Sequence, residues 1–398
     1  MLLALLLACT EPAPPTLEPR KNAVVIVIDT LREDALHTAR MPNVNGVGER
    51  GDVAFGWSSG TWTVPSVIAL FTGRPVGSHG WNLGTGRMGK YPALPATPTL
   101  AEVLHEAGFN TVGLYANPYL AEKLGFSRGF DDWRRVGDKA MPQELAKSIS
   151  QHWDPQGRNF AYIHLIGPHS PLRPSDAARE RWHLDPQWFA DPKHPLEVGA
   201  PMRKDKPGID VAYHDAYYAV CEDVDAIVGQ ILTVLNPYRD DTLILLTSDH
   251  GELLGEHGRY GHGTEVWEPL THVPMLAENG GDLPERMGTA SIAAYVTRGL
   301  GLSYAWPTAV ETPLLVSQRE GKLALTVDGQ TKLIVDKDEQ FYDLGTDPGE
   351  LSPRSDPEAA AALRGQYSRW LPPTVSPGAD AQLDPGTREK VRELGYVE

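Results

Sequence analysis

The sequence predicts an α/β protein in which helices flank a doubly wound, mainly parallel sheet, with a small antiparallel sheet near the C-terminus. Two observations support the parallel sheet. Short runs of apolar, often β-branched residues are typical of strands buried on both faces, and stretches with helical periodicity separate these runs. A hairpin signal supports the antiparallel sheet, because Asp328-Gly329 separates the runs 321–327 and 331–335. We therefore expect a core over residues 21–300 and a C-terminal subdomain over 301–398.

The first strand is predicted over 23–28, where the run AVVIVI contains no polar side chain. It ends at Asp29, and open α/β sheets bind their ligands at the carboxyl ends of their strands. Later apolar runs predict three more strands, over 111–115, 160–165 and 241–247. Periodicity predicts helices over 99–108 and 211–235, and the first of these closes at a glycine.

The composition excludes several classes of protein. A chain of 398 residues with 36 Lys and Arg against 52 Asp and Glu has a formal net charge of −16. This charge disfavours nucleic acid as a partner, and it disfavours an anionic membrane surface in the same way. The chain has two cysteines, Cys9 and Cys221, so no disulfide framework is expected.

The N-terminus combines an apolar run with a Pro-rich stretch. Residues 1–9, MLLALLLAC, resemble a bacterial lipoprotein export signal in which Cys9 becomes lipidated, although no Lys or Arg precedes the run. Residues 10–20 are then expected to form a tether. This resemblance implies export to the bacterial periplasm or cell surface, with attachment to the membrane through the lipid on Cys9.

The segment 60–80 predicts a helix that begins near Thr63. Pro65 suits the first helical turn, because its missing N–H has no partner there, and the apolar run 67–71 follows. Thr63 then lies where free N–H groups and the helix dipole favour an anion. Its hydroxyl either caps the helix or, if it contacts a cation, acts as a nucleophile towards a bound oxyanion.

Polar residues follow three of the predicted strands, at Asp29, His169 and Asp249-His250. Because the carboxyl ends of parallel strands share one edge of a sheet, we expect these side chains to lie close together. Carboxylate oxygen together with imidazole nitrogen suits Zn²⁺, Mn²⁺ or Fe, whereas Ca²⁺ or Mg²⁺ is favoured if oxygen dominates. The sequence therefore predicts a divalent metal site at this edge.

Several ordered motifs resemble the sulfatase family of the alkaline phosphatase superfamily. They are IVIDTLRED, TWTVPSVIALFTGRPVGSHG and TSDHGELLGEHGRYGHG, together with QFYDLGTDPGE and the final ELGYVE. The resemblance extends from about residue 21 to the C-terminus and is weakest over 131–210. It implies a doubly wound α/β core and a metal-dependent ester hydrolase or transferase.

Residue by residue, the resemblance implies that Asp29, Asp249 and His250 hold the metal. It places Thr63 at the position of the nucleophile and implies that this hydroxyl also contacts the metal. His262 corresponds to a histidine near the leaving group. One ion is expected rather than two, because the further candidate ligands lack the spacing of a second cluster; these are His169, His214, Asp215, His257 and His262.

Three other residues are candidates for substrate contacts. His169 corresponds to a histidine on the substrate side of the family's site, with a possible role in protonating the leaving group. Asn117 falls near the position where many sulfatases carry a substrate-binding lysine. From the residues alone, Arg32 suits an anion clamp, and a structural pair with Asp34 or Glu33 is an equal alternative.

The chain departs from the family at two positions. The frame Cys-x-Pro-x-Arg, in which formylglycine is made, reads Thr63-Val64-Pro65-Ser66-Val67 here, and Thr30 replaces a second consecutive Asp. A threonyl ester has no second hydroxyl with which to expel sulfate, so water must cleave it. Threonine nucleophiles resemble the phosphodiesterase and the phosphoethanolamine or glycerol-phosphate transferase branches of the superfamily, which favours phosphoryl chemistry.

The sequence thus predicts a hydrolase of sulfate or phosphate esters that depends on Zn²⁺, Mn²⁺ or Ca²⁺ and acts through Thr63. A transferase of the phosphoethanolamine or glycerol-phosphate type is one alternative. A metal-containing binding protein without turnover is another. The expected substrate is a small molecule, or a glycan or lipid-headgroup ester.

Overall fold

The computed structural model describes residues 18–81, 90–189, 196 and 207–394. The predicted export signal (1–9), and the predicted tether as far as residue 17, lie outside these residues. Within the described part of the chain, no helix is both long enough and apolar enough to cross a bilayer.

A seven-stranded sheet forms the centre of the molecule, and it confirms the predicted mainly parallel architecture. Five neighbouring strands run parallel, while β12 pairs antiparallel with both β8 and β2 at one edge. The four strands predicted from the sequence are β1, β5, β7 and β8. In spatial order the sheet consists of β2 (Asp52–Val53), β12 (Met275–Glu278), β8 (Thr242–Thr247), β1 (Asn22–Ile28), β7 (Arg158–Leu165), β5 (Phe109–Tyr115) and β6 (Asp132–Arg135).

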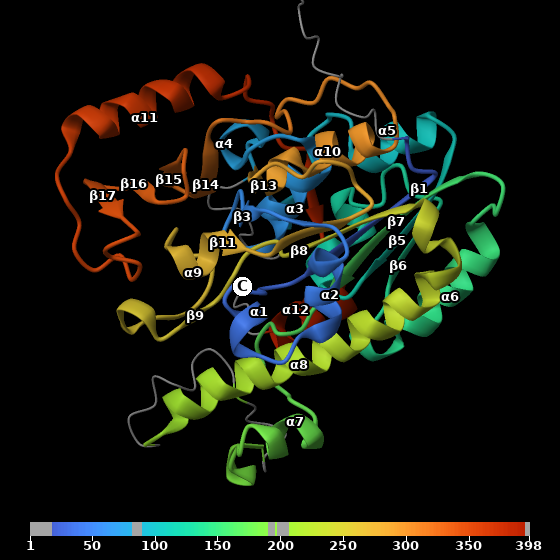
Figure 1. Ribbon diagram of the computed structural model, residues 1–398, viewed down its shortest axis with the longest axis horizontal. Helices are drawn as coiled ribbons and strands as arrows, with labels where there is room; N and C mark the ends of the chain where they lie inside the picture. Colours follow the sequence, from blue (N-terminus) through green and yellow to red (C-terminus); the bar gives the residue numbers. More distant parts are fainter. Residues whose placement is uncertain (1–17, 82–89, 190–195, 197–206, 395–398) are drawn as a thin grey trace, which may run out of the picture.

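Helices cover both faces of this sheet (Figure 1). Successive side chains of β1 point to opposite faces, so Val24 and Ile26 join one apolar cluster and Val25 and Val27 join the other. The first face is covered by α1 (Ala35–Thr38), α2 (Pro42–Glu49), α6 (Met141–His152) and α8 (Ile209–Leu235). The second is covered by α3 (Thr63–Thr72), α5 (Leu100–Glu106) and α10 (Ile292–Gly299).

Smaller elements surround the carboxyl edge of the sheet. Strand β3 (Phe55–Trp57) lies between β11 (His272–Val273) and β13 (Arg286–Gly288) in a three-stranded sheet. The short helices α4 (Val76–His79) and α9 (Glu268–Thr271) follow α3 and precede β11, respectively.

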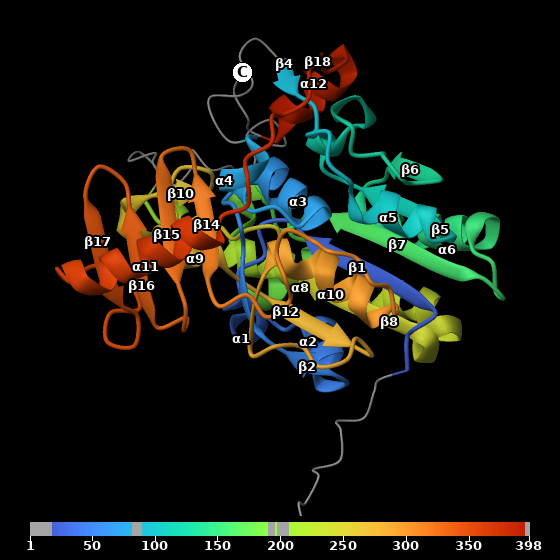
Figure 2. The same cartoon turned by 90° about the horizontal axis from the view of Figure 1, so that it is seen from above.

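A four-stranded antiparallel sheet lies beside the core (Figure 2). The predicted hairpin is present as β15 (Lys322–Thr326) and β16 (Thr331–Val335), and β17 (Glu339–Asp343) supplies the expected third strand. The sequence did not predict β14 (Leu315–Arg319), which pairs with β15. Helix α11 (Pro357–Trp370) packs on this sheet.

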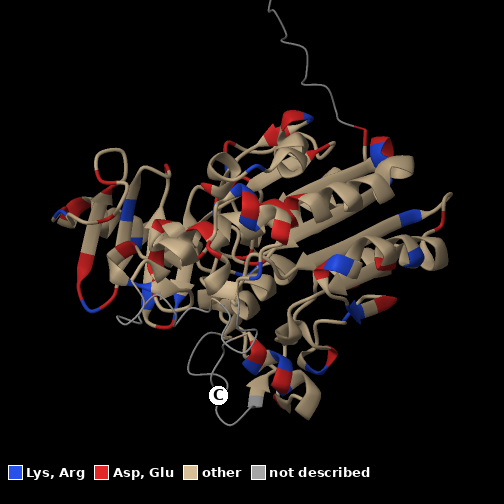
Figure 3. Cartoon of the chain, turned by 90° about the horizontal axis from the view of Figure 1, so that it is seen from below, with Lys and Arg blue, Asp and Glu red and all other residues tan. Residues whose placement is uncertain are grey.

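The end of the described chain returns to the core. Strand β18 (Asp380–Gln382) pairs with β4 (Lys90–Pro92), and α12 (Pro385–Glu393) follows it. Val391 of α12 joins the apolar cluster beneath α3 and α5. In the view of Figure 3, acidic and basic residues are interspersed along the surface elements.

Candidate active site

Thr63 is the first residue of α3, and its side chain is fully buried. The preceding residue, Trp62, is extended, and no side chain caps the helix. The Thr63 hydroxyl instead lies 3.4 Å from Asp29 Oδ2, to which it donates, and it accepts a hydrogen bond of 3.0 Å from Asn117 Nδ2. The structure therefore directs this hydroxyl toward the end of β1 and not back onto its own helix.

Asn117 lies within the site, at the start of a short 3-10 turn after β5. Its Oδ1 accepts a hydrogen bond from the Tyr119 N–H (3.0 Å), and this bond assigns the orientation of the amide. The Nδ2 group then donates both to Thr63 and to Asp29 Oδ2, the latter at 2.7 Å. Asn117 is thus a neutral donor that contacts the candidate nucleophile.

Asp29, Asp249 and His250 meet at the carboxyl ends of β1 and β8, as the sequence predicted. His250 Nε2 lies 3.6 Å from both Asp29 Oδ1 and Asp249 Oδ2. Asp249 Oδ1 accepts hydrogen bonds from the N–H groups of Thr30 (3.2 Å) and His250 (2.9 Å), which hold its other oxygen toward the cluster. Residues from distant parts of the chain thus converge on one point.

His164 of β7 completes this cluster, although the sequence analysis did not select it. Its Nε2 lies 3.6 Å from Asp249 Oδ2, and the side chain is fully buried. Ligand atoms of Asp29, His164 and Asp249 all lie within 4.8 Å of one another. In the sequence, residue 164 falls within the predicted strand FAYIHL, where the signal for a ligand is a single polar residue near the end of an apolar run.

Unsatisfied polar atoms indicate that the cluster fits a divalent cation. Asp29 Oδ1, Asp249 Oδ2, His164 Nε2 and His250 Nε2 are buried and have no hydrogen-bond partner among the described residues. Buried polar atoms without partners are costly, and a cation in their midst would satisfy all four. Two carboxylates and two imidazoles are a ligand set typical of Zn²⁺ or Mn²⁺.

The electrostatics of the carboxylates support the same conclusion. Burial, followed by the nearby charge of Asp249, raises the pKa of Asp29 well above its ordinary value. Two buried carboxylates whose oxygens lie within 4.8 Å of each other resist being ionised together unless a positive charge lies between them. A cation would supply that charge.

His262 and Glu252 form a buried pair beside the cluster. His262 Nδ1 lies 3.0 Å from Glu252 Oε2, and the ring centroid of His262 is 4.5 Å from that of His250. Burial raises the pKa of the Glu252 carboxyl to about 7 and lowers the pKa of His262 to about 4. The contact with Glu252 fixes the orientation of the His262 ring beside the metal-ligand cluster.

His169 lies on the other side of His262, with ring centroids 4.9 Å apart. Its Nδ1 contacts the carbonyl of Ser170, and burial lowers the pKa of the imidazole to about 3. The structure therefore places both predicted histidines, His169 and His262, next to the metal-ligand cluster.

Arg32 does not face the cluster. Its guanidinium binds Asp34 Oδ2 and Glu256 Oε1, each at 2.6 Å, and it also donates to the carbonyl of Glu252 at 3.1 Å. The structure thus shows the structural pair with Asp34 that the sequence left as an alternative to an anion clamp.

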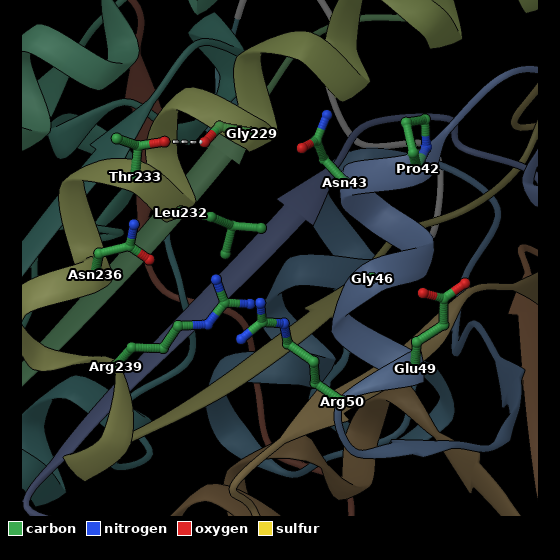
Figure 4. Close-up of a pocket in the computed structure, with 10 residues that line it drawn as sticks. All are labelled: Pro42, Asn43, Gly46, Glu49, Arg50, Gly229, Leu232, Thr233, Asn236 and Arg239. Atoms are coloured by element: carbon green, nitrogen blue, oxygen red, sulfur yellow. Dashed lines mark hydrogen bonds between the residues drawn. The ribbon is translucent and has the colours of Figure 1, made fainter.

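A separate pocket of about 330 Å³ lies at the opposite edge of the sheet, between α2 and the end of α8 (Figure 4). The guanidinium groups of Arg50 and Arg239 point toward each other there, and Arg239 forms a two-bond pair with Glu278 at 2.8 and 2.6 Å. None of the predicted site residues lines this pocket, so it is distinct from the candidate active site.

Comparison with solved structures shows the same fold elsewhere. The phosphonate monoester hydrolase of Agrobacterium radiobacter superposes with a TM-score of 0.67 at 17% identity, covering 88% of this chain and 95% of that one. The structure of BT4656 in complex with D-glucosamine-2-N,6-O-disulfate superposes with a TM-score of 0.65 at 15% identity, covering 94% and 98%.

Sequence comparison identifies the family. The Low-salt glycan biosynthesis sulfotransferase Agl7 of Haloferax volcanii is 24% identical over 262 residues, which cover 64% of this chain. The match covers 53% of Agl7, so it spans about half the length of that curated relative. A family model described as Sulfatase matches residues 21–298, well over half of the chain. The chain therefore belongs to the sulfatase family of the alkaline phosphatase superfamily.

Proposed function

We propose that this protein is a metal-dependent hydrolase of sulfate or phosphate esters that uses Thr63 itself, without formylglycine, as the nucleophile. The observation that carries the proposal is the position of the Thr63 hydroxyl. It lies at the start of α3, 3.4 Å from a carboxylate of the metal-ligand cluster. A helix N-terminus favours the oxyanion that such a nucleophile would attack.

The proposed metal ligands are Asp29, Asp249 and His250, as the sequence indicated, with His164 as a fourth. A divalent cation held there lowers the pKa of a hydroxyl beside it and stabilises negative charge on the transferred group. The mixed oxygen and nitrogen ligands favour Zn²⁺ or Mn²⁺ over Ca²⁺.

In the proposed reaction, Thr63 Oγ attacks the sulfur or phosphorus, and the bond to the leaving-group oxygen breaks. The Thr63 proton passes to Asp29 Oδ2, to which the hydroxyl already donates, and the Asn117 amide, 3.0 Å from Oγ, stabilises negative charge on that oxygen as the proton leaves. His262 Nε2 donates a proton to the leaving oxygen, and the Glu252 carboxyl supplies a proton at Nδ1. Water then cleaves the threonyl ester and releases sulfate or phosphate.

The transferred group is proposed to be phosphoryl more readily than sulfuryl. A threonyl ester must be hydrolysed by attack at the central atom, because no geminal hydroxyl is present to expel the anion. The fold is shared both with a phosphonate monoester hydrolase and with a protein whose bound substrate is a sulfated sugar. A small-molecule or glycan ester is accordingly the proposed substrate class.

Transfer to an acceptor alcohol is the second candidate function. It is favoured by the similarity to Agl7, a sulfotransferase, whose match covers 64% of this chain. The two functions differ only in whether water or an alcohol releases the threonyl ester.

The test compares wild-type protein with Thr63→Ala on p-nitrophenyl sulfate, p-nitrophenyl phosphate and bis(p-nitrophenyl) phosphate, with Zn²⁺, Mn²⁺ or Ca²⁺ added. We expect hydrolysis of at least one ester, and a loss of at least about 10³-fold in Thr63→Ala, equivalent to about 4 kcal/mol of barrier. Mass spectrometry of the quenched reaction should find the sulfuryl or phosphoryl group on the peptide that contains Thr63.

Thr72→Ala is the matched control, because Thr72 is the buried threonine at the other end of α3, where its hydroxyl donates to the Ile68 carbonyl and accepts from the Arg74 N–H. It should keep the wild-type activity. Full activity in Thr63→Ala would refute the nucleophile. A metal-loaded wild-type protein that turns over none of the esters, with or without an added alcohol, would favour the binding protein without turnover.

A further inference from the structure

Strand β14 connects the C-terminal sheet directly to the segment that precedes Thr63. The Gln318 N–H donates to the Ser59 carbonyl at 3.0 Å, and Gln318 forms a parallel bridge with Gly60. Arg319, the last residue of β14, is thereby held beside the turn that leads into α3. The position of this arginine is fixed by backbone contacts.

The guanidinium of Arg319 contacts residues adjacent to two proposed catalytic residues. It lies over the ring of Trp62, 5.5 Å from the centroid, and Trp62 immediately precedes Thr63. Its Nε donates to the carbonyl of Gly263, which immediately follows His262. A positive charge therefore stands between the nucleophile segment and the segment of the proposed proton donor.

Arg319 also lies at the boundary between the buried site and solvent. The Thr63 side chain is fully buried, whereas the Arg319 side chain keeps 21% of its surface exposed. It forms an ion pair with Glu320 at 2.8 Å, whose side chain is half exposed, and such surface pairs contribute little. A substrate anion can compete for a guanidinium in this position, because arginine stays charged and offers several N–H donors.

Other cations that the family motif would supply are replaced in this chain. Val67 stands where the motif has arginine, and Asn117 stands near the position of the usual lysine. Arg32 is already bound to Asp34 and Glu256. A positive charge near the site is supplied instead by Arg319 of the C-terminal sheet. This arginine lies beside the proposed reacting groups and does not contact them.

We propose that Arg319 determines specificity by binding an anionic substituent, a sulfate, phosphate or carboxylate, on the leaving-group part of the substrate. This inference rests on the proposed function. Arg319 is expected to bind the leaving-group part because it donates a hydrogen bond to Gly263. Gly263 follows His262, which is the proposed proton donor to the leaving group. The enzyme accordingly prefers esters whose alcohol carries a second negative charge.

The test uses two esters that differ in one charge: the 4-nitrophenyl ester and its 3-carboxy-4-nitrophenyl analogue, as the sulfate or phosphate that the enzyme accepts. Wild-type protein should prefer the carboxylated ester. Arg319→Met should lower kcat/KM for that ester by roughly tenfold to a hundredfold, as expected for a lost charge-assisted hydrogen bond, and affect the ester without the carboxylate far less. Arg319→Lys should retain part of the preference, because it keeps the charge but not the planar donor group.

Arg364→Met is the matched control, since Arg364 lies on α11 of the same subdomain and pairs with Glu339. It should leave both rates unchanged. Equal losses for both esters in Arg319→Met would show a structural role and overturn the proposal, as would an unchanged preference.

A binding measurement separates this inference from the proposed function. If wild-type protein hydrolyses neither ester, the proposed function fails, and calorimetric binding of both intact esters then tests Arg319 without turnover. Tighter binding of the carboxylated ester that is lost in Arg319→Met supports the anion site. Equal binding of the two esters by wild-type protein refutes it.

Discussion

His164 illustrates how one residue can change the character of a metal site. It lies on β7, directly opposite Val27 of β1, so its imidazole enters the cluster from the strand beside Asp29. Both of its ring nitrogens lack hydrogen bonds among the described residues. A buried imidazole without a partner costs about 1–3 kcal/mol, which coordination would recover. We therefore expect His164 to be a ligand and not a passive neighbour.

His164→Ala should weaken metal binding at least about tenfold, a loss comparable to or larger than that caused by removing an outer-shell partner. The measurement is a competition titration with a chelator, followed by elemental analysis of metal per chain. His105→Ala is a suitable control, because His105 is an exposed histidine on α5 whose ring pairs with Asp131. Unchanged metal affinity in His164→Ala would remove this residue from the ligand set.

The sequence predicted those site residues that lie at strand ends and helix starts. Asp29, Asp249 and Thr63 follow or begin recognisable elements, and parallel strands bring such positions to one edge. His164 was not predicted because it lies inside an apolar strand, where a lone histidine looks like core. Glu252 was not singled out because its role depends on the fold of the loop that returns His262 to it.

At the scale of elements, the short helix α4 fixes the first turn of α3. His79, the last residue of α4, is fully buried, and its Nε2 lies 3.2 Å from the Pro65 carbonyl in that turn. Its Nδ1 accepts a hydrogen bond from the Trp81 N–H at 3.1 Å. Both nitrogens are thus satisfied by a neutral imidazole with its proton on Nε2. A proton added to Nδ1 would break the second bond.

This contact predicts a pH-dependent contribution to stability. Burial, with a smaller effect from Arg74, lowers the pKa of His79 to about 3, whereas an unfolded histidine titrates near 6.5. Between pH 3 and pH 6.5, His79 is protonated in the unfolded chain and neutral in the folded chain. The contribution of His79 to the free energy of unfolding is therefore fully present above pH 6.5 and falls as the pH is lowered. In urea unfolding, the stability advantage of wild type over His79→Gln should shrink by about 2 kcal/mol from pH 7 to pH 5.

His37→Gln is the control for this experiment, because His37 is an exposed histidine of α1 paired with Glu33. The stability difference between wild type and His37→Gln should not change in this way between pH 7 and pH 5. If the stability advantage of wild type over His79→Gln stays constant from pH 7 to pH 5, folding does not lower the pKa of His79, and the folded protein is protonated there at pH 5.

Among the elements, long patterned segments were predictable and short edge strands were not. The run 23–28 is predicted as a buried strand, and Thr99 and Glu102 form the two reciprocal hydrogen bonds of a capping box at the start of α5. Strand β6 at one edge of the sheet and β12, which lies between β2 and β8 near the other edge, have four residues each, DWRR and MLAE, and no alternating pattern. They become strands because a neighbouring strand offers free backbone groups, which is tertiary information.

At the scale of the whole molecule, the C-terminal part of the chain is tied to the core at several places. Strand β14 bonds to Ser59, and β18 pairs with β4. A third tie is Lys332 of β16, whose fully buried ammonium group lies 2.8 Å from Glu350 and 3.0 Å from Glu268 of α9. Because these ties reach the segment before Thr63, the geometry of the active site depends on a subdomain that contributes none of the proposed metal ligands.

Lys332→Met should therefore destabilise the whole molecule and not the C-terminal sheet alone. The substitution leaves the buried Glu350 carboxylate without its cation, a change that typically costs about 3–5 kcal/mol. Denaturant unfolding, followed by far-UV circular dichroism and by tryptophan fluorescence, should show one shifted transition in both signals. Lys322→Met, in the neighbouring strand, removes a partly exposed pair with Glu265 and should cost only about 0–1 kcal/mol. Two separate transitions, with the core unaffected by Lys332→Met, would mean that the subdomain folds independently and that its contacts do not hold the site in place.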